Sequence, residues 1–297
     1  MKRLTAWCVE FLWFGVRQAR ACLFAGLFLG LLWVSSRLPL GDLPRYDFIL
    51  IGALMIQGAL LAAGIERWRD VRATSVFHLL GFALEAFKTS PAIASWAYPE
   101  HSYLRLLGVP LYSGFMYAAI ASYMIHSFRH LELRLADMPR ERWAAALAVA
   151  IYANFFSHHL LGDHRWWLAA AVLLLFRKTR VYYRPWRAER WMPLVAGFAL
   201  IGLFVWVAEN IGTYAGAWRY PDQSHGWKMV HAGKASSWAL LVIMSFLIAH
   251  SAVRTRRAPQ SLERTQSARV LASTAPDCRA TSRPPLNITR VGIERMP

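Results

Sequence analysis

Long apolar runs separated by short polar segments are the dominant pattern of this sequence. A helix that crosses a bilayer needs about 20 mostly apolar residues, because the hydrocarbon layer is about 30 Å thick. The clearest runs are residues 21–34 with their flanks, 46–65, 106–128, 143–160, 192–212 and 236–253. Two weaker runs, residues 73–88 and 165–182, are shorter or carry charge at their ends. The pattern predicts an all-α fold, a polytopic transmembrane helical bundle of about eight spans.

The positions of the basic residues support this count of spans. Short cytoplasmic loops retain Lys and Arg. With eight spans and a cytoplasmic start, the inner segments before the C-terminal tail carry 17 basic residues, and the outer segments carry 8. We therefore expect a multi-pass protein with both termini in the cytoplasm. Six or seven spans would break the alternation.

The two ends of the chain differ from this apolar domain, residues 21–253. Residues 1–20 place Leu4, Trp7, Phe11 and Phe14 at helical spacing, which predicts an amphipathic interfacial segment, with a secretory signal peptide as the alternative. Residues 254–297 are rich in Arg, Ser, Thr and Pro, which predicts a disordered basic cytoplasmic tail.

Composition and charge identify the partners that we expect. The chain is 56% apolar and 17% charged, with a net charge of +17. Because the basic residues separate apolar runs, we expect the lipid bilayer and anionic lipid at the cytoplasmic face as partners, and no nucleic acid. Three widely spaced cysteines match neither a disulfide framework nor a metal knuckle.

A motif occurs twice, in predicted outer segments at residues 83–101 and 207–227. In each copy a helical Glu is followed about ten residues later by Trp-x-Tyr-Pro and an acidic residue. The copies comprise Glu85, Trp96, Tyr98, Pro99 and Glu100, then Glu209, Trp218, Tyr220, Pro221 and Asp222. The tryptophans are 122 residues apart and the glutamates 124. This offset predicts two four-helix repeats of the same orientation.

These residues, with Asn210, form a predicted polar and aromatic site on the outer face. Glu85 and Glu209 are its candidate proton donor and acceptor, because carboxylates at this depth usually face a bundle interior or a cavity. The structural alternative is that Trp and Tyr belong to the interfacial aromatic belt, and that Lys88, one turn after Glu85, forms a local ion pair. On the preceding small-residue span, Tyr112 and Tyr117 either line a cleft or pack in the core.

A cluster of imidazoles and a carboxylate lies at the outer end of run 143–160. Its members are His158, His159, Asp163 and His164. Such ligands suit zinc or iron, and His159 and Asp163 at i, i+4 would share a helix face. Hydrogen bonding to headgroups and water is the alternative interpretation.

Several longer motifs together resemble a known family. FALEAFKTS, SWAYPE, GVPLYSGFMYA, IYANFFSHH, YRPW, WVAENIGTYAGAWRYPDQ and KASSWALLV occur in order between residues 77 and 246. They resemble the bacterial multi-pass membrane family catalogued as domain of unknown function 817, although Ser157 stands where Thr is expected. The resemblance implies an inner (plasma) membrane protein of bacteria without an assigned activity. Residues 209–220 are also similar to a short pattern in membrane hydratases of carotenoid biosynthesis.

Three kinds of function fit these features. The first is transport or binding of a small solute or protons at Glu85 and Glu209. The second is an intramembrane enzyme that acts on an isoprenoid or other lipid, with Glu209 as acid and Glu85 or Asp222 as base. The third is a membrane assembly factor whose aromatic residues anchor a partner protein. The sequence leaves open whether the protein is an enzyme.

Overall fold

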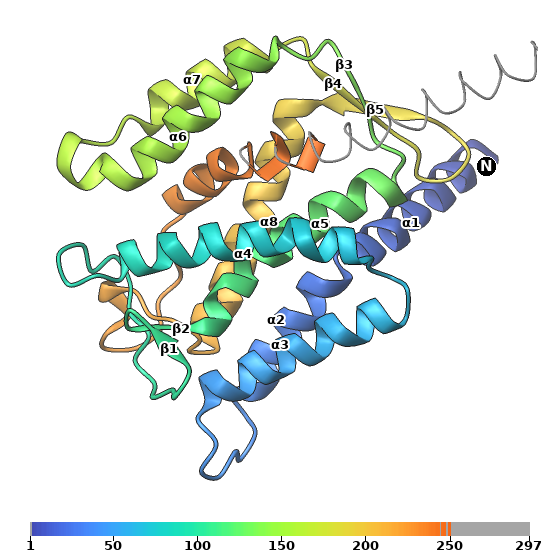
Figure 1. The fold of residues 1–297 in the computed structure, drawn as a ribbon. Coiled ribbons are helices and arrows are strands. Elements are labelled where there is room, and N and C mark those ends of the chain that lie inside the picture. The colour runs from blue at the N-terminus through green and yellow to red at the C-terminus, as the bar shows by residue number, and fades with distance from the viewer. Residues whose placement is uncertain (1, 244, 248, 251–297) are drawn as a thin grey trace, which may run out of the picture. The chain divides into compact units, whose positions relative to one another are not determined.

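The computed structural model describes residues 2–243, 245–247 and 249–250, and this part of the chain is mostly helical (Figure 1). The helices are α1 (Lys2–Ala21), α2 (Leu23–Ser35), α3 (Arg45–Ala62), α4 (Trp68–Lys88), α5 (Gly114–His130), α6 (Glu141–Leu161), α7 (Arg165–Phe176), α8 (Leu194–Tyr214) and a last described helix, Gly233–Leu247. The predicted tail, residues 254–297, lies outside the described residues.

Two of these helices, α3 and α8, are by themselves long and apolar enough to cross a membrane. Helices α1 and α2 are together long and apolar enough to form a third span, although the chain bends by 69° between them. Length and composition thus support membrane-crossing helices at two or three of the predicted positions. The eight-span arrangement goes beyond this finding.

Short strands interrupt the expected all-helical fold. Strands β1 (Arg105–Leu106) and β2 (Val109–Pro110) form a hairpin, and β3 (Arg134–Ala136), β4 (Arg180–Tyr183) and β5 (Arg190–Pro193) form an antiparallel sheet in the order β3-β4-β5. In two of the predicted apolar runs, the helix is therefore shorter than the run. Run 106–128 becomes helical only at a 3-10 turn, η1 (Leu111–Ser113), because its first residues turn at Gly108 (φ +78°). Run 165–182 ends as a helix at Phe176, because its last residues belong to β4.

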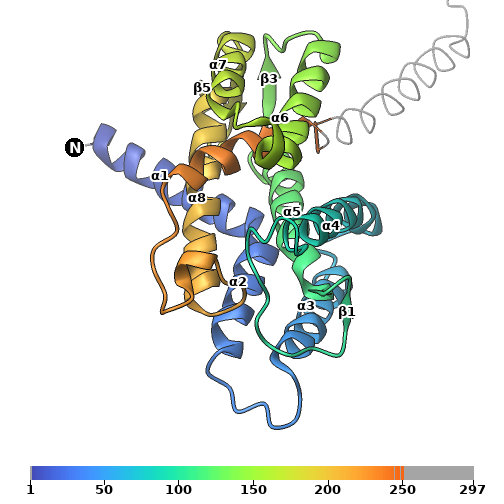
Figure 2. The same cartoon turned by 90° about the vertical axis from the view of Figure 1, so that its left-hand side faces the viewer.

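The helices pack as pairs around two apolar clusters. Helices α2 and α3 form one hairpin, α4 lies against α5, and α6 and α7 lie side by side in both views (Figures 1 and 2). Gly162, at φ +84°, separates α6 from α7, a backbone conformation that favours glycine. One cluster gathers side chains of α2, α3 and the loops that carry the duplicated motif, and the other gathers side chains of α5 to α8 and the last described helix. The motif loops are therefore part of a core.

Glycines permit two of the close helix crossings. At Gly202 of α8, an added Cβ would lie 2.7 Å from the backbone of Ala239 in the last described helix. At Gly81 of α4, an added Cβ would overlap the ring of Tyr117 in α5. Both pairs of helices cross where one of them has no side chain.

We expect Gly202→Ala to destabilise the protein by about 1–3 kcal/mol, because backbone atoms of Ala239 must move to accept the new methyl group. Gly197→Ala is the matched control on the same helix, since nothing lies within 4 Å of its added Cβ. Helix propensity should stabilise that control slightly. Thermal unfolding of the purified proteins in detergent measures both, and equal melting temperatures would contradict the expected crossing.

Candidate functional site

The two copies of the motif lie against each other. We call residues 96–100 the first motif segment and residues 218–222 the second. Ala97 and Arg219 exchange both backbone hydrogen bonds, each 2.9 Å long, in an isolated antiparallel bridge. The rings of Trp96 and Tyr220 meet edge to face, with centroids 6.1 Å apart. The structure thus brings together motif residues that are 122 positions apart in the sequence.

Glu85 lies at the centre of the first copy. Its side chain is buried near the end of α4, and three aromatic donors from the motif and from α5 surround it. Trp96 Nε1 and Tyr98 Oη donate to Oε2 at 2.6 and 2.7 Å, and Tyr117 Oη donates to Oε1 at 2.8 Å. Burying a carboxylate costs several kcal/mol unless such bonds replace its hydration. Glu85 therefore fixes the first motif segment to α4 and α5.

Glu209 has the same position in the second copy. It is buried near the end of α8, where Tyr220 Oη donates to Oε1 and Trp238 Nε1 donates to Oε2 at 2.5 Å. Trp218 packs against Gly212, one turn after Glu209, at a site where an added Cβ would overlap the indole. Each carboxylate thus holds the Tyr of its own motif segment and an aromatic residue of the helix that follows.

The helix ends around the two carboxylates match in a further detail. Thr89 Oγ1 donates to the Glu85 backbone oxygen at 2.8 Å, and Thr213 Oγ1 donates to the Glu209 backbone oxygen at 3.0 Å. Both threonines follow their glutamate by four residues. The full pattern is therefore Glu-x-x-x-Thr before each Trp-x-Tyr-Pro.

Both motif tyrosines are held in the neutral form. Burial, followed by the nearby Glu85 carboxylate, raises the pKa of Tyr98 well above its ordinary value. Burial and the Glu209 carboxylate have the same effect on the pKa of Tyr220. Both phenols therefore remain donors to their carboxylates across the physiological pH range.

A polar cavity of about 200 Å³ lies between the two motif copies and the α6–α7 hairpin. Its lining includes polar and aromatic groups of both copies and of α6, namely Lys88, Ser95, Trp96, Asn154, Phe155, His158, Asp163, Arg165, Tyr220, Lys234, Ser237 and Trp238. Cavities of about 150 Å³ in other proteins hold a ligand the size of benzene. This cavity is therefore large enough for a small solute.

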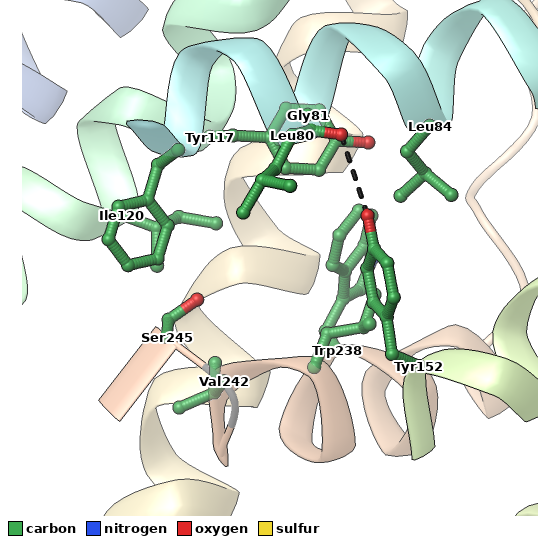
Figure 3. Close-up of a pocket in the computed structure, with 11 residues that line it drawn as sticks. Leu80, Gly81, Leu84, Tyr117, Ile120, Tyr152, Trp238, Val242 and Ser245 are labelled. Carbon is green, nitrogen blue, oxygen red and sulfur yellow. Dashed lines mark hydrogen bonds between the residues drawn. The ribbon is translucent and has the colours of Figure 1, made fainter. Parts of the chain in front are cut away.

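A much smaller apolar pocket, about 30 Å³, shares Trp238 with the lining of this cavity (Figure 3). Leu80 and Gly81 of α4, Tyr117 of α5 and Tyr152 of α6 border it, and Tyr152 Oη donates to the Leu80 backbone oxygen at 3.5 Å. Trp238 thus borders both the polar cavity and the apolar pocket.

Three other predicted site residues have contacts within the protein or face outward. Glu100 accepts a hydrogen bond from Arg45 Nη1 at 2.7 Å in an ion pair that is partly exposed. Asn210 donates to the Trp206 backbone oxygen and accepts from Val230 N, so it positions the loop after the second motif segment. Asp222 is exposed.

The predicted metal ligands are arranged as follows. Asp163 accepts hydrogen bonds from the backbone and side chain of Arg165, and these bonds lower its pKa against the opposing effect of partial burial. His158 Nδ1 lies 3.1 Å from the Phe155 backbone oxygen, and His164 N donates to Asn154. The side chain of His159 lies outside the described part. Among the described residues, no group of three or more His, Cys, Asp or Glu side chains could hold a metal ion. Zinc or iron at this cluster stays a prediction.

Sequence reasoning did not identify Tyr117 and Trp238 as partners of the glutamates, nor Lys234 as a lining residue. A signal was present for the first two. Tyr117 and Trp238 are 121 residues apart, close to the offset of the motif, and each follows its motif tyrosine by 18 or 19 residues.

These observations define a mostly helical protein with two paired, carboxylate-centred motifs. The chain belongs to the family described as "Protein of unknown function (DUF817)", which matches residues 10–246. It is 47% identical over 238 residues to "Uncharacterized protein YoaT" of Bacillus subtilis (strain 168), a match that covers 80% of this chain and 89% of that protein. No solved structure matches the chain. The predicted family membership is confirmed.

We expect Glu85→Leu to lower the free energy of unfolding by about 3 kcal/mol or more, because two buried donors and one partly buried donor lose their acceptor at a cost of roughly 1–3 kcal/mol each. Tyr117→Phe removes one donor and should cost only about 1 kcal/mol. Glu189→Leu is the control, since Glu189 pairs with an exposed Arg134 and such pairs contribute about 1 kcal/mol or less. Thermal unfolding compares the three, and a Glu85→Leu protein as stable as the control would refute the anchoring role.

Proposed function

We propose that this protein spans the bacterial inner membrane about eight times and binds a small solute for transport in the polar cavity. The observation that carries the proposal is the cavity of about 200 Å³ that both motif copies border. Binding sites of many carriers lie where two structural repeats meet. Trp96 comes from the first motif segment and Tyr220 from the second, so the cavity has this position.

The proposed repeats comprise α2 to α5 and α6 to the last described helix. Three kinds of contact recur at offsets of 121 to 124 residues: the carboxylate with its aromatic donors, the Thr bond at the helix end, and the glycine crossing. The second helix of each half also begins with an arginine, Arg45 in α3 and Arg165 in α7. The helices of the two proposed repeats follow one another in the same order and make the same kinds of contact, which supports two parallel repeats.

Contacts on the proposed cytoplasmic side support the placement of the inner loops. Strand β3 belongs to inner segment 129–142, and its partner β4 belongs to inner segment 177–190. Trp13 of the N-terminal helix stacks on Trp186 of the second of these segments, at 6.2 Å. Separate segments that the basic residues assign to one side are therefore in contact.

Contacts on the proposed outer side are consistent with the same topology. Arg45 Nη2 donates to the Ala215 backbone oxygen at 2.6 Å, and Arg165 Nη1 donates to the Gly233 backbone oxygen at 3.3 Å. Together with the Ala97–Arg219 bridge, these bonds connect outer segments to one another. Both termini would then be cytoplasmic.

Anionic lipid is the partner that we propose at the cytoplasmic face. The β3-β4-β5 sheet and its turns gather basic residues there, namely Arg134, Arg180, Arg184, Arg187 and Arg190. Each basic residue close to an anionic leaflet contributes about 1 kcal/mol to attraction.

The enzyme hypothesis has less support from this geometry. Within the described residues, the cavity is lined by the aromatic donors Tyr220 and Trp238, while the Glu209 carboxylate that they bind is not among the lining residues. An acid–base group must reach the atom that it protonates. Glu209 therefore serves better as the support of the cavity wall than as a reacting group.

The topology predicts opposite labelling of two exposed positions. In a protein whose Cys8, Cys22 and Cys278 are replaced by Ser, we expect a membrane-impermeant maleimide to label Tyr103→Cys in intact spheroplasts. We expect it to label Arg187→Cys only after permeabilisation, because Arg187 follows the inner strand β4. Labelling of both positions from the same side would contradict the eight-span topology.

The solute-binding proposal predicts selective retention of a compound. We expect equilibrium dialysis of the purified protein against a bacterial metabolite extract, with mass spectrometric detection, to enrich a small solute on the unmodified protein. Ser237→Trp should abolish the enrichment by filling the cavity, whereas Ser75→Trp on the exposed face of α4 should preserve it. No enrichment, or equal enrichment by all three proteins, would overturn the proposal.

A further inference from the structure

We propose that the solute carries a carboxylate or phosphate group, and that this group binds between the ammonium groups of Lys88 and Lys234. The inference rests on the proposed function, because it assigns a ligand class to the same cavity. Both lysines line the cavity, although they come from different helices and lie 146 residues apart in the sequence.

Each lysine that lines the cavity lies close to aromatic rings. Lys88 is 1% exposed, and its Nζ lies 4.6 Å from the ring centroid of Phe155 in α6. Lys234 Nζ lies 4.5 Å from the ring centroid of Tyr220 and 5.7 Å from that of Trp96. Aromatic faces attract an ammonium group. The two cations repel each other, so an anion between them would relieve this repulsion.

Acidic residues near the cavity already have other contacts. Asp163 is bound by the backbone and side chain of Arg165. Glu209 attracts Lys234, yet its two oxygens accept bonds from Tyr220 and Trp238. Asp222 attracts Lys234 from an exposed position, while Arg165 repels it. Among the described residues, the lining therefore holds three cationic side chains, those of Lys88, Lys234 and Arg165, against the one carboxylate of Asp163.

Neither lysine is repeated in the other copy of the duplicated motif. Lys88 follows Glu85 by three residues, and the matching position after Glu209 is Gly212. Lys234 precedes Trp238 by four residues, and the matching position before Tyr117 is Ser113. The second copy therefore builds its carboxylate centre without the counterpart of Lys88, and the first without that of Lys234. Both lysines line the cavity, whereas the matching positions, Gly212 and Ser113, do not. This difference favours a role in ligand binding over a structural role.

The anionic group has two sources. A free solute would reach the cavity through water, and a lipid headgroup would place its acyl chain on apolar surface such as the pocket of Figure 3, which shares Trp238 with the cavity. Carboxylate and phosphate chemistry is common to both sources. The test therefore needs a soluble arm and a lipid arm.

In the soluble arm, the full-length protein in phosphatidylcholine nanodiscs is dialysed against radiolabelled inorganic phosphate or acetate at constant ionic strength. We expect saturable binding, and we expect Lys234→Gln to weaken it at least about tenfold, the loss typical of one charge-assisted bond. Lys228→Gln is the control, because that lysine lies on an exposed loop and should leave binding unchanged. In the lipid arm, phosphatidylglycerol replaces part of the phosphatidylcholine, and the melting temperature should rise for the unmodified protein and for Lys228→Gln only.

Binding in either arm that depends on Lys234 supports the inference and identifies the source. Lys88→Gln supplies a second variant, which should show the same loss and retain the folded state because it removes a buried charge. Absence of binding in both arms overturns the inference, as does equal binding by all variants. If the metabolite dialysis instead yields a neutral or cationic solute that Ser237→Trp excludes, the proposed function stands and the anion assignment fails.

Discussion

Each copy of the motif depends on the hydrogen bonds between its buried glutamate and the aromatic donors around it. A carboxylate away from water is destabilising unless donors replace its hydration, and aromatic N–H and O–H groups provide donors on large apolar bodies. Trp96, Tyr98 and Tyr117 meet this need at Glu85, and Tyr220 and Trp238 meet it at Glu209. These bonds fix the motif loops, and the fixed loops can then pair at Ala97 and Arg219.

The two motif copies differ in the helix hairpin that lies next to each of them. On the first side, Tyr46 at the start of α3 packs its ring against Tyr98 and Tyr112, and Arg45 connects α2, Glu100 and the end of α8. On the second side, α7 begins in the same way with Arg165, but the next residue, Trp166, is largely exposed. A filled core on one side thus corresponds to a polar cavity on the other.

Several elements could be read from the sequence, because their signals are local. Helices α3, α6 and α8 coincide with apolar runs of span length, and Pro44 and Pro193 directly precede two of them. The strands could not be read in this way. Val109 and Pro110 continue an apolar run, and β4 pairs on one side with β5, a few residues later, and on the other side with β3, more than 40 residues earlier. Such pairing depends on partners that periodicity does not show.

For the site, the duplicated spacing predicted that the motif residues belong together, and the paired segments agree with this. Glu85 illustrates what spacing leaves out. Lys88, one turn away, suggested a local ion pair as the structural alternative. The hydrogen bonds to the carboxylate come from the indole and phenol groups of a later loop and of α5. The cavity itself depends on how α6 packs over both motif copies, and no local pattern contains that information.

The α6–α7 hairpin is attached to the rest of the protein at both of its ends. Helix α6 begins a few residues after β3, and α7 ends a few residues before β4, so the base of the hairpin is joined to one sheet. Its tip carries Asp163 and Arg165 in the lining of the cavity, and Arg165 Nη1 donates to the Gly233 backbone oxygen. The cavity wall that α6 provides is therefore held between two attachment points, so a change at either end would alter the shape of the binding space.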